Sequence, residues 1–187
     1  HLKSLSKEDF SKFITITKGV NYHELAHILF TNASHNRIVD FCNEKMKSVA
    51  QFAWDNYFQT FNLLEDCRIE NLFSAEYLRA KYYFSFAAIT IIMNNNKAQD
   101  ERVILPNYLL LYGRKFLEID LSKFRQNIKF DNKILVQCET IVDKFLTEED
   151  IIKRLELNYD LMKILVGNSQ IIINVSNQNS IDNSKKG

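Results

Sequence analysis

Turn-forming residues are scarce in this chain: its 187 residues include only four glycines and one proline, Pro106. Sandwiches of short strands and glycine-looped α/β folds need such residues at most of their turns. Hydrophobic residues make up 46% of the chain and aromatic residues 12%, enough for a sizeable core and unlike a disordered chain. The length matches one domain of ordinary size. We therefore predict a mainly α fold, a compact helical domain with at most a minimal β-sheet.

Charge, cysteine usage and hydropathy exclude several classes of protein. Lysine and arginine (24) nearly balance aspartate and glutamate (23), which gives no electrostatic case for nucleic-acid binding. The three cysteines are odd in number and form no CxxC pair, as is typical of a reducing compartment. The longest strongly apolar run, 84–93, is half the roughly 20 residues of a membrane span. We expect no nucleic acid, no membrane and no secretion signal; the start without Met suggests a fragment of a longer protein.

Apolar residues spaced by three and four positions predict helices along most of the chain. The expected ranges are 20–30, 38–46, 52–73, 77–93, 106–117, 132–145 and 148–165. Ser4 or Ser6 is expected to cap a first helix, Pro106 to open the fifth range and Thr147 to cap the last. Residues 13–17 could form a strand or continue a helix. These patterns predict one domain over 1–167, followed at 168–187 by a short strand or adhesive segment and a polar tail.

Residues 23–27 read His-Glu-Leu-Ala-His, which is an HExxH motif. Residues four apart on a helix share a face, so His23 and His27 could bind one Zn²⁺ at about 2.0–2.1 Å from each ring nitrogen. Glu24 projects about 100° from the first histidine and could act as general base on a zinc-activated water. The alternative is a structural patch in which the two histidines and the glutamate only hydrogen-bond.

A third metal ligand is expected on another segment. The metzincin continuation HExxHxxGxxH is missing, because the glycine is absent and His35 lies two positions too far along, so His35 is only a spare candidate. Residues 61–73 offer more, since Asn62, Asp66 and Glu70 recur every four residues and form a polar stripe on an apolar helix. One carboxylate of such a stripe could bind the metal while the next holds a ligand histidine.

The HELAH helix followed by an acid-bearing helix resembles the gluzincin branch of zinc metallopeptidases. More narrowly, HELAHILFT with NLLEDCRIE resembles metallopeptidase-like domains of phage and bacterial proteins, often encoded beside a von Willebrand A-type domain. The resemblance covers 19–73, about a third of the chain. It implies a zincin-like fold, a zinc cofactor, a protein or peptide substrate, a neighbouring von Willebrand A-type domain or protein as partner, and the cytoplasm of a bacterial cell or phage-infected host.

The resemblance also assigns roles to individual residues. It implies zinc ligation by His23, His27 and Asp66, general-base catalysis by Glu24, and a hydrogen bond from a ligand histidine to Glu70. The acids stand in the reverse of the thermolysin-like order, so Glu65 remains a rival third ligand. Arg68 is expected to pair with an acid such as Glu65, or to form a surface salt bridge of little weight. His35, Tyr57 and Tyr22 are open candidates for a group that stabilises the transition state.

The expected function is hydrolysis of peptide bonds, with two alternatives. One is a non-catalytic structural, assembly or protein-interaction module, such as a viral component, whose metal site only stabilises the fold. The other is a helical partner-binding domain without metal. Zincins usually hold their substrate at the edge of a small sheet, and only residues 13–17 and 170–175 qualify here as strands.

Overall fold

The computed structural model describes residues 6–32, 35–45, 51–95, 101–126, 128 and 130–168. All regular secondary structure in the described residues is helical, and they include no strand, which confirms the predicted mainly α fold. None of their helices is both long and apolar enough to cross a bilayer. The predicted strand at 170–175 lies outside the described residues.

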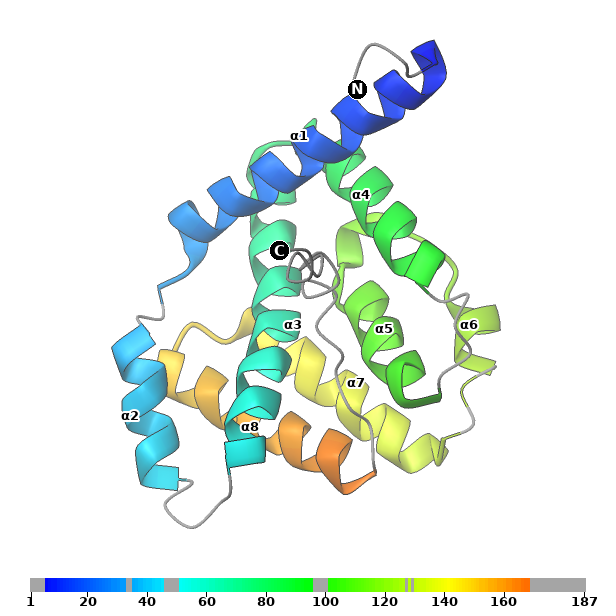
Figure 1. The fold of residues 1–187 in the computed structure, drawn as a ribbon. Helices are drawn as coiled ribbons and strands as arrows, with labels where there is room; N and C mark the ends of the chain where they lie inside the picture. The colour runs from blue at the N-terminus through cyan, green and yellow to red at the C-terminus, as the bar shows by residue number, and fades with distance from the viewer. Residues whose placement is uncertain are drawn as a thin grey trace, which may run out of the picture.

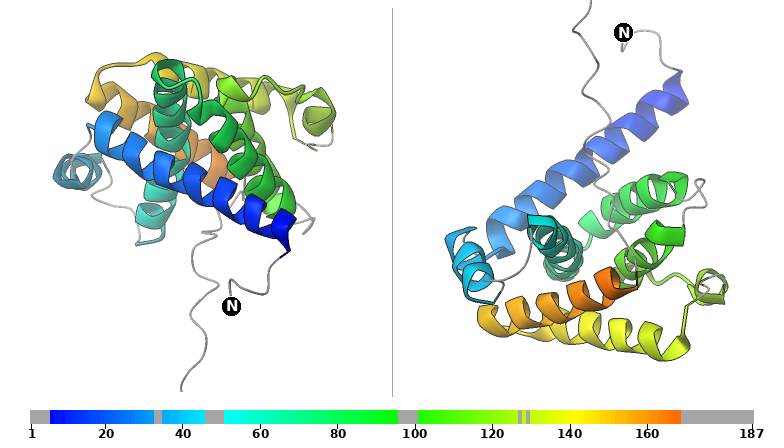
Figure 2. Two further views of the ribbon diagram at one scale, coloured as in Figure 1. Left: turned by 90° about the horizontal axis from the view of Figure 1, so that it is seen from above. Right: turned by 60° about the horizontal axis from the view of Figure 1, so that its bottom comes forward.

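The helices follow one another with short connections. In chain order they are α1 (Lys7–Phe30), α2 (His35–Lys45), α3 (Gln51–Glu76), α4 (Ala80–Asn95), α5 (Glu101–Gly113), the 3₁₀-helix η2 (Lys115–Leu117), α6 (Ser122–Gln126), α7 (Asn132–Thr147) and α8 (Ile151–Gly167). Figure 1 shows α3 running through the middle, with α1 across one end and α7 and α8 across the other. The N-terminal end of α1 reaches beyond the helices that it crosses (Figure 2).

Two hydrophobic clusters form the core, and α3 contributes to both. The larger one joins α2, α3, α5, α7 and α8, and its fully buried members include Tyr57, Leu64, Leu109, Phe145 and Leu161. The smaller one joins α1, α3, α4, α5 and η2, and includes Ala26, Ile69, Phe73, Phe84 and Phe116. Because α3 is packed on nearly every side, most polar residues in its central turns must find partners inside the protein.

Residues 13–17 continue α1 and do not form a strand. Their β-branched side chains fit the helix because the hydroxyl groups of Thr15 and Thr17 donate to the carbonyl oxygens of Ser11 and Phe13, at 2.9 and 2.8 Å. Ser6, one of the two expected caps, accepts from the backbone N–H of Asp9 at 3.1 Å. The motif helix therefore starts well before position 20.

Two predicted helix starts are wrong. Pro106 lies inside α5, which begins at Glu101, because Leu105 packs in the core ahead of the proline and extends the apolar pattern upstream. The hydrogen bond that Pro106 lacks falls close to the helix start. Thr147 ends α7, and Asp150 caps α8 by accepting from two backbone N–H groups. The five-residue helix α6 is too short for a periodic pattern to reveal.

α1 passes closely over α4 at Gly19, where substitution is expected to separate the two helices. A Cβ there would lie 2.7 Å from the Tyr83 carbonyl oxygen and 2.8 Å from the Ala87 Cβ, neither of which can rotate away. We expect Gly19→Ala to lower the free energy of unfolding by about 1–3 kcal/mol, measured by urea denaturation. Gly167→Ala is the matched control, because among the described residues no atom beyond its chain neighbours and its own helix backbone lies within 4 Å of its Cβ position. Equal losses in both variants would contradict the prediction.

Candidate metal centre

The two motif histidines meet one carboxylate where α1 crosses α3. The Nε2 atoms of His23 and His27 lie 3.2 Å apart. The Oδ1 atom of Asp66 lies 3.3 Å from Nε2 of His27 and 3.8 Å from Nε2 of His23. These side chains are 24%, 31% and 26% exposed, so solvent reaches the cluster. The structure thus brings the two predicted histidines together with Asp66, the favoured one of the two candidate acids.

This triangle of atoms fits a tetrahedral metal ion. Zinc binds nitrogen and oxygen ligands at about 2.0–2.2 Å, and tetrahedral ligands at that distance stand roughly 3.3–3.6 Å apart. The three separations here, 3.2, 3.3 and 3.8 Å, surround that value. Two imidazoles, one carboxylate and access from solvent match the composition of catalytic zinc sites, which have three protein ligands and an open position.

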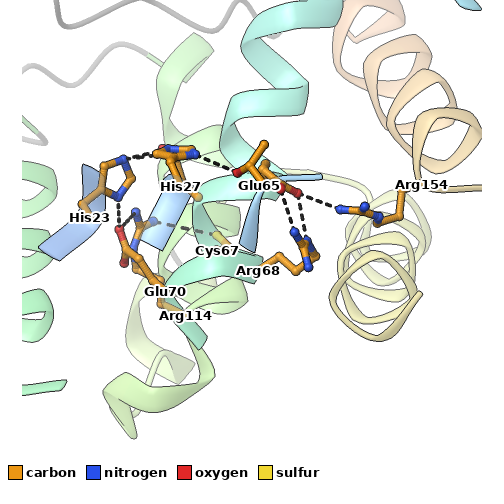
Figure 3. Close-up of polar contacts among 10 residues, drawn as sticks. His23, His27, Glu65, Cys67, Arg68, Glu70, Arg114 and Arg154 are labelled. Atoms are coloured by element: carbon orange, nitrogen blue, oxygen red, sulfur yellow. Dashed lines mark hydrogen bonds and ion pairs between the residues drawn. The ribbon is translucent and has the colours of Figure 1, made fainter. Parts of the chain in front are cut away.

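Hydrogen bonds on the far side of each ring determine which nitrogen faces the cluster. Nδ1 of His23 lies 2.8 Å from Oε1 of Glu70 (Figure 3). Nδ1 of His27 lies 3.0 Å from the Thr31 hydroxyl. A carboxylate can only accept, so in the neutral His23 ring the proton sits on Nδ1 and the lone pair on Nε2. If Thr31 accepts likewise, two lone pairs face each other across 3.2 Å, an arrangement that a cation between them stabilises.

Glu70 is held as a carboxylate in the interior by Arg114. Burial alone would raise the pKa of Glu70, but the Arg114 guanidinium and the hydrogen bond to His23 outweigh it, and the pKa is lowered. Burial alone would likewise lower the pKa of His23, but Glu70 and the charge of Asp66 raise it. His23 therefore binds a proton more readily than an ordinary histidine does.

Glu65, the rival third ligand, points away from the histidines. Its carboxylate receives Arg68 Nε at 2.9 Å and Nη2 at 2.7 Å, and Arg154 Nη1 at 3.0 Å (Figure 3). Glu65 is 1% exposed and Arg154 is fully buried, so Arg68 belongs to a buried ion cluster and not to a surface pair. Three charge-assisted bonds already occupy the Glu65 oxygens, whereas Asp66 approaches both histidines.

The same two arginines fix the end of the motif helix. Arg68 Nη2 donates to the carbonyl oxygen of Phe30, the last residue of α1, at 2.6 Å. Arg154 donates to the side chain of Asn32, two residues further on. We call Glu65, Arg68 and Arg154 the arginine clamp. It ties the C-terminal end of α1 to α3 and α8, one turn beyond His27.

The remaining candidates are not drawn into the cluster. Glu24 is exposed on α1, and the described residues give it no hydrogen bond or ion pair. The Tyr57 hydroxyl is buried and donates to the Leu155 carbonyl at 3.0 Å, roughly 13 Å along α3 from Asp66. Tyr22 packs its ring against aromatic side chains of α3 and α4. The side chain of His35 lies outside the described part of the structure.

Sequence reasoning missed Arg114 and Arg154. Arg114 lies 44 residues after Glu70, directly behind the glycine that ends α5. Arg154 is a basic residue on the buried face of α8, four residues before the equally buried Asn158. The one sequence signal is that Arg154 interrupts an apolar helix face, which calls for a buried acid elsewhere. Arg114 lies between α5 and η2, where no helical spacing marks it.

Comparisons of the chain with protein-family models, curated proteins and solved structures find no match. The resemblance to gluzincins therefore rests on the two motifs alone. What the structure adds is that these motifs, 39 residues apart from His27 to Asp66, meet in space with the spacing of metal ligands.

Proposed function

We propose that His23, His27 and Asp66 bind one zinc ion and that the protein is a zinc-dependent peptidase with Glu24 as general base. The observation that carries the proposal is the triangle of two Nε2 atoms and one carboxylate oxygen, all within 4.8 Å of one another. Zinc is preferred over magnesium or calcium because two of the three donors are imidazole nitrogens. From the resemblance carried by the two motifs, we further propose that the substrate is a protein or peptide and that the partner is a von Willebrand A-type domain or protein. We place the protein in the cytoplasm of a bacterial cell or phage-infected host.

The chain's own residues supply the rest of the proposed chemistry. Zinc, when bound, would act as a Lewis acid on water and on the scissile carbonyl group. Glu24 stands at the solvent-exposed edge of α1, next to the first ligand, where its carboxylate can take a proton from water and return it to the leaving amine. Glu70 and Thr31 keep the ligand rings oriented from behind.

The second candidate is a metal-stabilised structural or interaction module without catalysis. The observation that favours it is that the described residues contain no strand, whereas zincin-like peptidases present a sheet edge to their substrate. A metal that joins α1 to α3 would stabilise the folded state without performing a reaction. In that case removal of zinc would lower the melting temperature and abolish no hydrolysis.

Glu24→Gln separates catalysis from metal binding. We expect the wild type and Glu24→Gln to hold about one zinc per chain, because Glu24 is not a ligand in the proposal. We expect hydrolysis of fluorescently labelled casein to fall about 10²–10⁴-fold in Glu24→Gln. Elemental analysis of untagged protein and the casein assay measure the two quantities. Glu8→Gln, an exposed site on the same helix, is the matched control and should change neither.

The outcomes of this experiment distinguish the candidates. Zinc without hydrolysis in the wild type favours the structural module. Equal hydrolysis by the wild type and Glu24→Gln contradicts the assigned base. No zinc after reloading contradicts both metal-dependent readings and leaves the helical partner-binding domain.

A further inference from the structure

Arg114 is a buried cation whose bonds all point into the protein. Its guanidinium donates to Glu70 twice, from Nε to Oε2 at 2.7 Å and from Nη2 to Oε1 at 3.1 Å. Nη1 donates to the Leu110 carbonyl oxygen at 3.0 Å. The side chain is only 7% exposed, so it serves neither solubility nor a surface contact. A two-pronged pair of this kind fixes the plane of the carboxylate as well as its position.

Glu70 passes this orientation on to His23. Oε1 of Glu70 takes a bond from Arg114 on one side and lies 2.8 Å from Nδ1 of His23 on the other (Figure 3). An imidazole ring held at Nδ1 has a defined direction for Nε2, which here points at His27 and Asp66. Arg114 is therefore two hydrogen bonds away from a proposed metal ligand without touching the metal position itself.

The backbone around Arg114 is built to hold it there. A Cβ on Gly113 would lie 2.7 Å from the Cys67 sulfur, so glycine lets the end of α5 approach α3 one turn before Glu70. The Asn71 amide donates to the carbonyl oxygens of Cys67 and Gly113, each at 2.7 Å, and bridges the two helices. The side-chain oxygen of Asn71 accepts from the backbone N–H of Phe116 at 3.3 Å, which ties η2 to the same point.

We propose that Arg114 is a positioning residue of the candidate metal centre. By holding the Glu70 carboxylate against Nδ1 of His23, it sets the tautomer and the direction of that ring, so that Nε2 is free to bind a metal. The effect on zinc affinity rests on the proposed function, whereas the effect on the ring belongs to the metal-free protein. The two can therefore be tested apart.

The test measures the His23 ring directly. Long-range ¹H–¹⁵N spectra of zinc-free, ¹⁵N-histidine-labelled protein at alkaline pH distinguish Nδ1–H from Nε2–H tautomers, with signals assigned through a His23→Gln variant. We expect the wild type to show the Nδ1–H form and Arg114→Met to show a mixture. Zinc affinity, from competition with a chromophoric chelator, should fall about 10–100-fold in Arg114→Met.

Two further variants guard against a purely structural effect. Arg114→Lys retains the charge but not the two-pronged geometry, so we expect an intermediate mixture of tautomers and an intermediate zinc affinity. It decides the question if Arg114→Met does not fold. Arg125→Met removes another arginine–glutamate pair, with Glu139, outside the candidate metal centre and should leave both readouts unchanged.

An unchanged His23 tautomer in Arg114→Met and Arg114→Lys overturns the inference, even if the stability falls. A wild type that binds no zinc contradicts the proposed function, and the spectra still decide the role of Arg114.

Discussion

Glu65→Ala is expected to lower the free energy of unfolding by about 3–5 kcal/mol, the largest loss among the substitutions considered. The carboxylate of Glu65 compensates two buried cations, Arg68 and Arg154, and its removal leaves both in the interior without an acid. Arg154 already lacks one hydrogen bond, because its buried Nε atom has no partner among the described residues. Urea denaturation followed by circular dichroism measures the loss.

Two controls isolate the cause of that loss. Glu65→Gln keeps the volume and one acceptor oxygen, so its loss should be smaller than that of Glu65→Ala. Glu156→Ala removes a glutamate from an exposed pair with Lys45 and should cost no more than about 1 kcal/mol. A loss below about 1 kcal/mol in Glu65→Ala would contradict the clamp as an important stabilising element.

Asp66→Ala is expected to remove zinc and to leave the fold in place. An apparent zinc-binding free energy of about 10–16 kcal/mol, divided among the four ligands of a structural zinc site, gives roughly 2.5–4 kcal/mol for each, which is on the order of 10²–10³-fold in affinity. The Asp66 side chain is 26% exposed and borders solvent, so its loss leaves no closed cavity. Elemental analysis and chelator competition measure the affinity, and urea denaturation of the zinc-free protein checks the fold.

Substitution of Glu65, the acid next to Asp66, is expected to give the opposite result. Folded Glu65→Ala should still hold about one zinc per chain, because its carboxylate is occupied by arginines and not by the histidines. Asn62→Ala, one turn before Asp66 and exposed, is a second control that should retain zinc. Zinc lost from Glu65→Ala and kept by Asp66→Ala would exchange the two assignments.

Most of the fold followed from local properties of the chain. Few glycines, one proline and three-to-four-residue spacing predicted helices at 52–73 and 132–145, and the structure has α3 and α7 there. The predicted start of α5 was wrong because tertiary packing outweighs local preference there, and α6 was missed because it is short. Pro106 lies within α5 because the residues before it have a core to enter, and α6 has too few residues to show a period.

In the candidate site, too, local spacing predicted some residues, and tertiary packing determines the others. The four-residue spacing within HELAH and within Asp66–Glu70 places side chains on common helix faces, so the sequence alone could propose both sets. The choice between Asp66 and Glu65 depends on which face of α3 meets α1 and which meets α8, and neighbouring residues on a helix point about 100° apart. Arg114 and Arg154 come from other helices, so no spacing rule could have found them.

The arginine clamp also orders events during synthesis of the chain. Arg154 bonds to Glu65, 89 positions earlier, and to Asn32, 122 positions earlier. At about 5–20 residues per second, a ribosome adds Arg154 roughly 6–24 s after Asn32. Once Arg68 has been added, Glu65 has a single arginine partner until Arg154 follows, and until then the end of α1 also lacks its contact with α8. The histidine-bearing turn is translated long before α8, yet its anchorage is completed only when α8 leaves the ribosome.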